Sequence, residues 1–180
     1  MEKNNYVVAI DLGSSGVIVA VGSRAEDGKL FIEEVVQRES KGISRGEVKN
    51  VELAAQSIKE AVSEMEQKLG IKITEAYTGI SGSHLRCAKH PYYVYVASKD
   101  GEIFDEDVRK LNESMRNVQA PDGYKLMQII PQHYIVNEDE EVADPVGMFG
   151  KTLGSTFNLI IGENVIISRL EKALQKVGIE

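Results

Sequence analysis

The chain has 180 residues, is 42% hydrophobic and carries a formal net charge of -7. This length predicts one domain or two small ones with a real core. The acidic balance disfavours general binding to nucleic acid or anionic lipid, because both require a concentrated basic face. A single cysteine, Cys87, excludes an internal disulfide framework and is typical of a reducing compartment. No apolar run approaches the roughly 18 to 20 residues that span a bilayer, and residues 1–5 lack a signal-peptide core, so we expect a soluble cytoplasmic chain.

Three β-strands joined by short turns are predicted first, over residues 6–12, 17–23 and 30–37. The runs YVVAIDL and VIVAVGS are apolar and β-branched, and they are short for helices. Gly28 is free to take the positive φ of a tight turn. Residues 41–49 contain two glycines and no periodicity, so we expect a loop there.

A helix is predicted over residues 51–69, because its apolar residues recur at three- and four-residue intervals. Asn50 is placed to cap its start, and Gly70 to end it. A short strand over residues 75–80 follows. The order strand, strand, strand, helix, strand indicates an α/β fold.

The pattern changes character after residues 81–83, and residues 83–162 predict a small strand–helix–strand–strand unit inserted into the first fold. The expected elements are a strand over 92–97, a helix capped by Asp105, strands over 124–130 and 133–136 separated by Pro131, an acidic loop over 137–144 and a strand over 151–161. A last helix, capped by Asn164 and closed by Gly178, returns the chain to the first fold.

The motif that carries chemistry lies at the end of the first strand, and it consists of Asp11, Gly13, Ser14, Ser15 and Gly16. A tight turn there aims several backbone N–H groups at one point, which suits an anion, and glycines let phosphate oxygens approach the backbone. The two serine hydroxyls add donors. Asp11 is placed to hold a hydrated Mg²⁺, which keeps several waters and few protein ligands.

Taken alone, this motif also fits a glycine-rich hairpin turn with exposed serines, because short motifs are weakly specific. It is not a Walker loop, since no G-K-[ST] follows and the next element is a strand. The surrounding strand order resembles that of the actin, hexokinase and heat-shock ATPase superfamily.

Four further segments narrow the resemblance to the FtsA family of bacterial cell-division proteins. They are KGISRGEVKN at residues 41–50, ISGSH at 80–84, IIPQHY at 129–134 and DPVGMFG at 144–150. These segments lie in order across nearly the whole chain. The resemblance implies a partial actin-like (ribonuclease-H-like) subdomain 1A, residues 1–82 and 163–180, and an inserted α+β subdomain 1C, residues 83–162.

The resemblance also implies a role. FtsA-family proteins bind ATP and Mg, polymerise, tether FtsZ filaments to the inner face of the cytoplasmic membrane and recruit later division proteins. The implied ATP contacts in this chain are the five loop residues. Many members of the family have a lysine where this chain has Gly16, so one phosphate-facing charge is expected to be absent.

The chain ends at Glu180, and the second phosphate loop, the adenosine pocket, the main FtsZ-binding region and the C-terminal membrane helix would all follow it. We therefore expect this chain alone to bind ATP weakly or not at all and to be inactive, with slow or no ATP turnover in the family. Self-association and division partners are expected to involve residues 83–162.

Two other functions are compatible with the same fold. A pilus-assembly scaffold of the actin-like class shares the inserted subdomain but resembles residues 41–50 and 144–150 less. A sugar kinase would need a catalytic base and a sugar pocket, and no acid or base beyond Asp11 is evident. A binding module confined to residues 83–162 agrees with the first reading.

Other polar and aromatic residues have structural explanations. The spacing of His84, His90 and His133 matches no common metal-ligand pattern. Alternation in the strand places Tyr93 and Tyr95 on one face and Tyr92, Val94 and Val96 on the other. We expect core or sheet packing to account for most of the tyrosines, and a partner surface is the alternative for one face.

Overall fold

The computed structural model describes residues 6–180, and the chain divides into two compact units. The first comprises the residues up to His84 and Val165–Glu180, and the second is Leu85–Asn164. The predicted boundaries, after residues 82 and 162, each lie two residues before the boundaries in the structure, which follow His84 and Asn164. No helix in the described part of the chain combines the length and apolar character needed to cross a bilayer.

The first unit is built on a mixed β-sheet with the strand order β3-β2-β1-β6 among the described residues. β1 (Tyr6–Leu12), β2 (Gly16–Arg24) and β3 (Leu30–Glu39) form the predicted antiparallel meander. β6 (Tyr77–Thr78) pairs parallel to β1 and is shorter than the expected strand over 75–80. The turn between β2 and β3 contains Gly28 at φ 84°, as expected.

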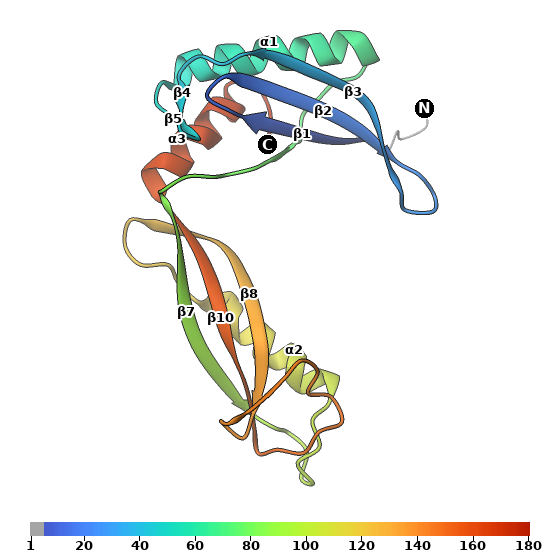
Figure 1. Ribbon diagram of the computed structural model, residues 1–180, viewed down its shortest axis with the longest axis vertical. Helices are drawn as coiled ribbons and strands as arrows, with labels where there is room; N and C mark the ends of the chain where they lie inside the picture. Colours follow the sequence, from blue (N-terminus) through green and yellow to red (C-terminus); the bar gives the residue numbers. More distant parts are fainter. Residues whose placement is uncertain (1–5) are drawn as a thin grey trace. The chain divides into compact units, whose positions relative to one another are not determined.

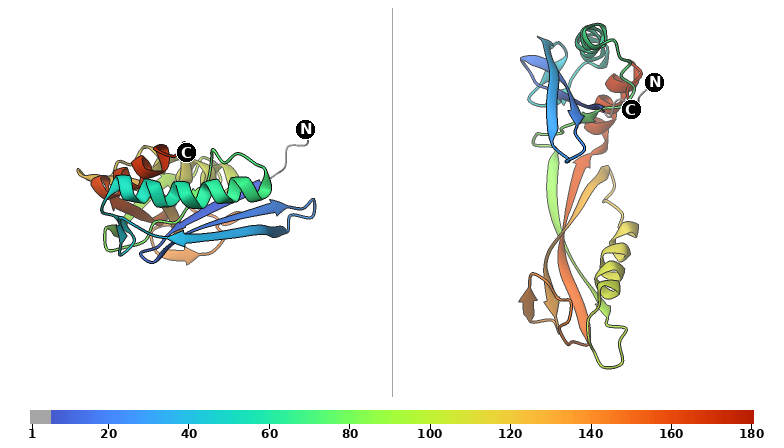
Figure 2. Two further views of the ribbon diagram at one scale, coloured as in Figure 1. Left: turned by 90° about the horizontal axis from the view of Figure 1, so that it is seen from above. Right: turned by 90° about the vertical axis from the view of Figure 1, so that its right-hand side faces the viewer.

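Helix α1 (Val51–Leu69) lies along this sheet, as Figures 1 and 2 show. Its first turn is capped by Asn50, whose Oδ1 accepts the Leu53 N–H at 3.1 Å. Gly70 ends it in the left-handed conformation. Both caps confirm the prediction. The helix buries its apolar face, including Ile58 and Met65, against the sheet, and α3 (Asn164–Gln175) adds to the same core.

The expected loop over residues 41–49 is wrong in part, because the segment contains a short hairpin. β4 (Ile43–Ser44) pairs antiparallel with β5 (Glu47–Val48). Ile43 and Val48 are buried in the core of the first unit, and Gly42 O accepts the N–H groups of Lys49 and Asn50. Two buried residues in so short a segment are too few to produce a periodic pattern.

The second unit is a sheet with the order β7-β10-β8-β9, and helix α2 lies along it (Figure 2, right). The strands are β7 (Leu85–Tyr95), β8 (Tyr124–Val136), β9 (Glu140–Val142) and β10 (Thr152–Glu163). α2 (Asp105–Ser114) continues into the 3-10 turn Met115–Asn117. The core between helix and sheet includes Leu111, Phe157 and Leu159.

Three predictions for this unit are corrected. β7 begins at residue 85, not 92, because β10 pairs with it from Leu85 to Tyr95. Pro131 does not divide β8, because a register shift opposite Ser155 and Phe157 accommodates it. The acidic loop contains β9, whose Glu140 and Glu141 have side chains exposed to solvent while their backbones pair with β8.

The N-terminus of α2 is capped differently from the prediction. Asp105 lies inside the helix, and the residue before it is Phe104. The buried carboxylate of Asp107 accepts the Phe104 N–H at 3.1 Å and the Ala97 N–H at 3.0 Å. A side chain at the third helical position thus satisfies the N–H of the preceding residue. Through its bond to Ala97, this carboxylate also connects the segment just after β7 to the helix.

Asp107→Ala is expected to destabilise the second unit by about 3 kcal/mol, because two backbone N–H groups lose a charged acceptor. Asp107→Asn retains one oxygen acceptor and should lose clearly less. The measurement is urea denaturation followed by amide resonances of residues 85–164. An Asp107→Ala variant as stable as the wild type would contradict this role.

In the first unit, Glu66 accepts the Ile73 N–H at 2.8 Å and pairs with Lys72. Burial raises the pKa of Glu66, but the hydrogen bonds from Ile73 and Lys72 together lower it by more. The net result is a pKa below the ordinary value of 4.5. A carboxyl whose pKa is lowered by folding stabilises the fold above its unfolded pKa, and this contribution disappears as the pH falls through the folded pKa.

Glu66→Ala should therefore cost about 1–2 kcal/mol at neutral pH, and the difference from the wild type should shrink below pH 4.5. Glu66→Gln keeps the acceptor for Ile73 without the charge and serves as the control. Urea denaturation followed by amide resonances of the first unit gives both values. A difference that is the same at neutral and acidic pH would refute the assignment.

Candidate functional site

The predicted phosphate loop connects β1 to β2, between the paired residues Leu12 and Val17. The Gly13 N–H donates to Gly16 O at 3.0 Å and closes the turn, so this N–H is committed within the loop. The N–H groups of Ser14 and Ser15 have no acceptor among the described residues. Two adjacent free N–H groups at the tip of the turn form the donor set that an anion requires.

The space above Gly13 lies between the loop backbone and Asp11. A Cβ added at Gly13 would be 3.0 Å from Gly16 O and 3.9 Å from Asp11 Oδ2. A side chain at this position would fill the approach to the loop, whereas glycine keeps it open. Asp11 is exposed on β1, on the opposite face from the buried Ile10 and Leu12. The loop thus combines two free backbone donors with one exposed carboxylate at the end of β1.

Ser14 has a contact that the sequence did not predict. Its Oγ accepts the backbone N–H of Arg45 at 2.8 Å, which joins the loop to the turn between β4 and β5. The hydroxyl proton of Ser14 remains available to a ligand. Ser15 is exposed, and its hydroxyl has no partner among the described residues.

Gly16 is the first residue of β2, packed beside β3. A Cβ here would lie 2.8 Å from Gln37 Nε2 and 3.4 Å from Arg38 O. The close atom belongs to the movable end of a side chain, and the φ of Gly16 is not in the left-handed region. The backbone therefore accepts a side chain at this position once the Gln37 amide moves.

Sequence reasoning missed Arg45 as a neighbour of the loop. It lies at φ 54° in the two-residue turn between β4 and β5, and Gly46 follows at φ 74°. The available signal was the Arg-Gly dipeptide between Ile43 and Val48, a pattern that is compatible with a two-residue hairpin turn. On the same turn, a hydrogen bond from Lys49 holds the pKa of Glu47 below its ordinary value and outweighs desolvation; the charges of His84 and Arg169 act in the same direction.

No group of three or more His, Cys, Asp or Glu side chains with metal-binding geometry occurs among residues 6–180. Within residues 11–16, Asp11 is the acidic side chain that is available to a cation. His84 is buried at 2% exposure, and Cys87 is exposed.

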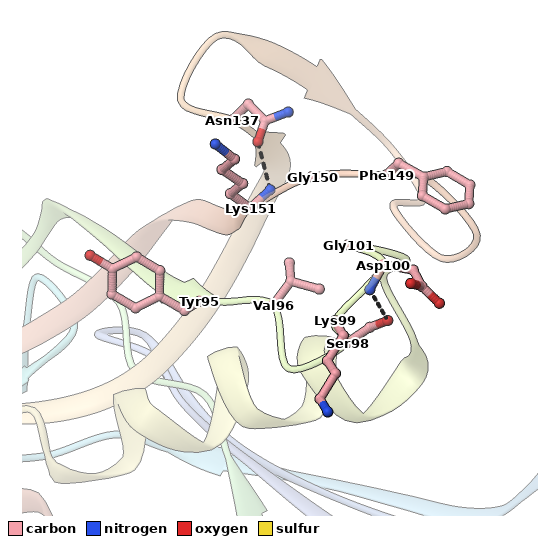
Figure 3. Close-up of a pocket in the computed structure, with 10 residues that line it drawn as sticks. All are labelled: Tyr95, Val96, Ser98, Lys99, Asp100, Gly101, Asn137, Phe149, Gly150 and Lys151. Atoms are coloured by element: carbon pink, nitrogen blue, oxygen red, sulfur yellow. Dashed lines mark hydrogen bonds between the residues drawn. The ribbon is translucent and has the colours of Figure 1, made fainter.

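The second unit contains a cavity of about 780 Å³ at the end of its sheet (Figure 3). Tyr95 and Phe149 lie at opposite ends of it, and both are strongly exposed, at 78% and 63%. Its walls are held together by Asn137 Oδ1, which accepts the Lys151 N–H at 2.8 Å. Lys99 and Lys151 have no ion-pair partner among the described residues. Aromatic side chains are enriched at protein-binding surfaces, so the two exposed rings are the feature of this cavity that suits a partner protein.

The tyrosines of β7 follow the predicted alternation only in part, because Tyr92, predicted on the same face as Val94, is exposed at 38%. Val94 is buried between the exposed Tyr93 and Tyr95. A Cβ added at Gly154 would lie 2.1 Å from Tyr93 Cδ1, so the Tyr93 ring covers this glycine on the neighbouring strand. Tyr93 therefore has a packing role, whereas Tyr95 lines the cavity.

An α/β unit with a loop after its first strand and an inserted β-sheet unit defines the actin-like class with an insertion. The fold comparison agrees: a chain of the PilM-PilN type IV pilus biogenesis complex superposes with a TM-score of 0.57 at 14% identity, covering 96% of this chain and 45% of that one. At this identity the likeness concerns the fold.

Residues 82–161 match the family described as the SHS2 domain inserted in FtsA. The cell division protein FtsA of Bacillus subtilis is 30% identical over 180 residues, which is all of this chain and 41% of that protein. FtsA of Neisseria meningitidis serogroup B is 28% identical over 179 residues, 99% of this chain and 43% of that protein. The chain is thus similar to FtsA cell-division proteins along its whole length, and residues 82–161 match their inserted SHS2 domain, which confirms the resemblance. The chain spans about two fifths of the length of these relatives.

Ser14→Ala tests the contact between loop and turn. Removing the Oγ acceptor should speed hydrogen exchange of the Arg45 amide about fivefold, which corresponds to the loss of one ordinary hydrogen bond. Ser15→Ala, which removes a hydroxyl without such a contact, is the control. Equal exchange of the Arg45 amide in both variants and the wild type would show that the bond contributes nothing.

Proposed function

We propose that this chain is part of a cell-division protein that binds Mg-ATP, polymerises and tethers FtsZ filaments to the inner face of the cytoplasmic membrane. The observation that carries the proposal is the similarity to FtsA along the whole chain, which includes both the loop and the SHS2 domain. The free N–H groups of Ser14 and Ser15 support a phosphate site at the loop.

In this proposal the loop holds one side of the nucleotide. The Ser14 and Ser15 N–H groups donate to phosphate oxygens, and the Ser15 hydroxyl adds a donor. Asp11 accepts hydrogen bonds from waters of a hydrated Mg²⁺. The protein then has two states, one with Mg-ATP bound and one without it. Turnover is slow, because the described residues near the loop offer no general base besides the exposed Asp11.

The partners in this proposal are divided between the parts of the protein. FtsZ and the membrane are bound through regions that the relatives have beyond the length matched here. The second unit takes part in self-association and in contacts with later division proteins. The cavity between Tyr95 and Phe149 supports this assignment, because it presents two exposed aromatic rings.

A pilus-assembly scaffold is the second candidate, and the likeness to the PilM-PilN complex favours it. The two candidates differ in their partners. A full-length protein that contains this chain should bind an FtsZ C-terminal tail peptide and not a short peptide of the pilin-assembly complex. Fluorescence anisotropy with both labelled peptides measures this. Binding of the pilin-complex peptide alone would favour the scaffold.

Mg-ATP binding is tested by isothermal titration of this chain and of a full-length protein that contains it. The full-length protein should bind, and the chain alone should bind weakly or not at all, because one side of a cleft encloses little of the nucleotide. Gly13→Val in the full-length protein should abolish the heat signal, since its side chain fills the approach to the loop. Binding to neither wild-type protein would refute the nucleotide proposal.

A further inference from the structure

We infer that Arg45 is a phosphate-binding residue of the nucleotide site. Its guanidinium supplies, from the turn between β4 and β5, the positive charge that the loop itself lacks. The inference rests on the proposed function, and it adds a residue from a different element to the five residues of the loop.

The loop has a deficit of positive charge. Residues 11–16 read DLGSSG, with one acidic residue and no basic one. The chain as a whole is acidic, at a net charge of -7. Free N–H groups and a single Mg²⁺ leave much of the charge of a triphosphate unopposed, so a neighbouring cation would add substantially to binding.

Arg45 lies close enough to fill this deficit. Its backbone N–H is 2.8 Å from Ser14 Oγ, so the two residues are adjacent although 31 positions separate them in the sequence. The side chain of arginine extends several bonds beyond the backbone, and the planar guanidinium binds phosphate through two parallel hydrogen bonds.

The turn holds Arg45 in a defined position. Gly42 O accepts two N–H groups at the base of the hairpin, those of Lys49 at 2.8 Å and Asn50 at 3.0 Å. Gly46 packs so closely that a Cβ there would lie 2.4 Å from Ser81 O. Arg45 itself adopts φ 54°, a conformation that costs free energy for a residue with a side chain. The backbone of Arg45 therefore loses little further freedom when a ligand binds, and the ordering cost falls on its side chain.

The guanidinium is also free to bind. Arg45 is exposed, and its side chain has no hydrogen-bond or ion-pair partner within residues 6–180. Glu47, the acidic residue on the same turn, is paired with Lys49 instead. The alternative is an ordinary surface arginine whose backbone alone supports the loop. The two explanations differ in whether the charge of the side chain matters.

The test compares variants of a full-length protein that contains this chain, by titration with Mg-ATP and with adenosine. Arg45→Gln keeps the backbone contact to Ser14 and removes the charge. It should raise the Kd for Mg-ATP about tenfold or more, the loss expected for one charge-assisted hydrogen bond, and leave the Kd for adenosine unchanged. Arg24→Gln is the matched control, because Arg24 lies at the opposite end of β2 from the loop.

A second variant restores the charge from another position. Gly16→Lys combined with Arg45→Gln should recover most of the Mg-ATP affinity, since the backbone at residue 16 accepts a side chain once the Gln37 amide moves. Thermal melts show whether each variant is folded.

The outcomes separate this inference from the proposed function. Wild-type binding of Mg-ATP with Arg45→Gln within twofold of it would overturn the role of Arg45 and leave the nucleotide site standing. Equal losses for Mg-ATP and adenosine would show structural damage and also overturn it. Wild-type protein that binds no Mg-ATP would overturn both.

Discussion

The antiparallel ladder between β1 and β2 is the constraint on which the candidate site depends. It runs without a register shift from the pair Tyr6 and Ser23 to the pair Leu12 and Val17. The four residues between the paired Leu12 and Val17 must reverse the chain, and the bond from Gly13 N–H to Gly16 O closes this turn. The N–H groups of Ser14 and Ser15 in this turn have no acceptor among the described residues. The site is thus a consequence of where strand pairing stops, and its donors are those that the ladder leaves unpaired.

The same constraint explains why the loop depends on elements distant in sequence. β1 also pairs with β6, and the Thr78 hydroxyl donates to Ile10 O at 2.9 Å, one residue before Asp11. On the other side, the hairpin of β4 and β5 contacts the loop through Ser14. A short glycine-containing turn has little rigidity of its own. Its geometry is held by these neighbours, which are in turn held by the core beneath α1.

The second unit follows a different principle, because its central strand β10 pairs with both β7 and β8 along nearly its whole length. The helix covers one face of this sheet, and the cavity lies where connecting segments meet at the end of the strands. Backbone bonds such as Gly150 N–H to Gly101 O, 2.8 Å, hold these segments together. The lining side chains Tyr95 and Phe149 are therefore free to contact another molecule. A rigid frame with exposed aromatic residues suits a binding surface better than a catalytic site.

The sequence by itself determined the elements whose pattern is long and periodic: the meander, α1 with its two caps, and, in part, the alternation in β7. It also identified the loop residues from Asp11 to Gly16, because a glycine-serine turn after a buried strand is local information. It missed the full length of β7, because that length is set by the distant strand β10. It also missed the hairpin at residues 43–48 and the cap by Asp107, which are local but too short to produce a periodic pattern. Only the tertiary structure placed Arg45 beside Ser14, because no local pattern records which loop a turn will contact once the core has formed.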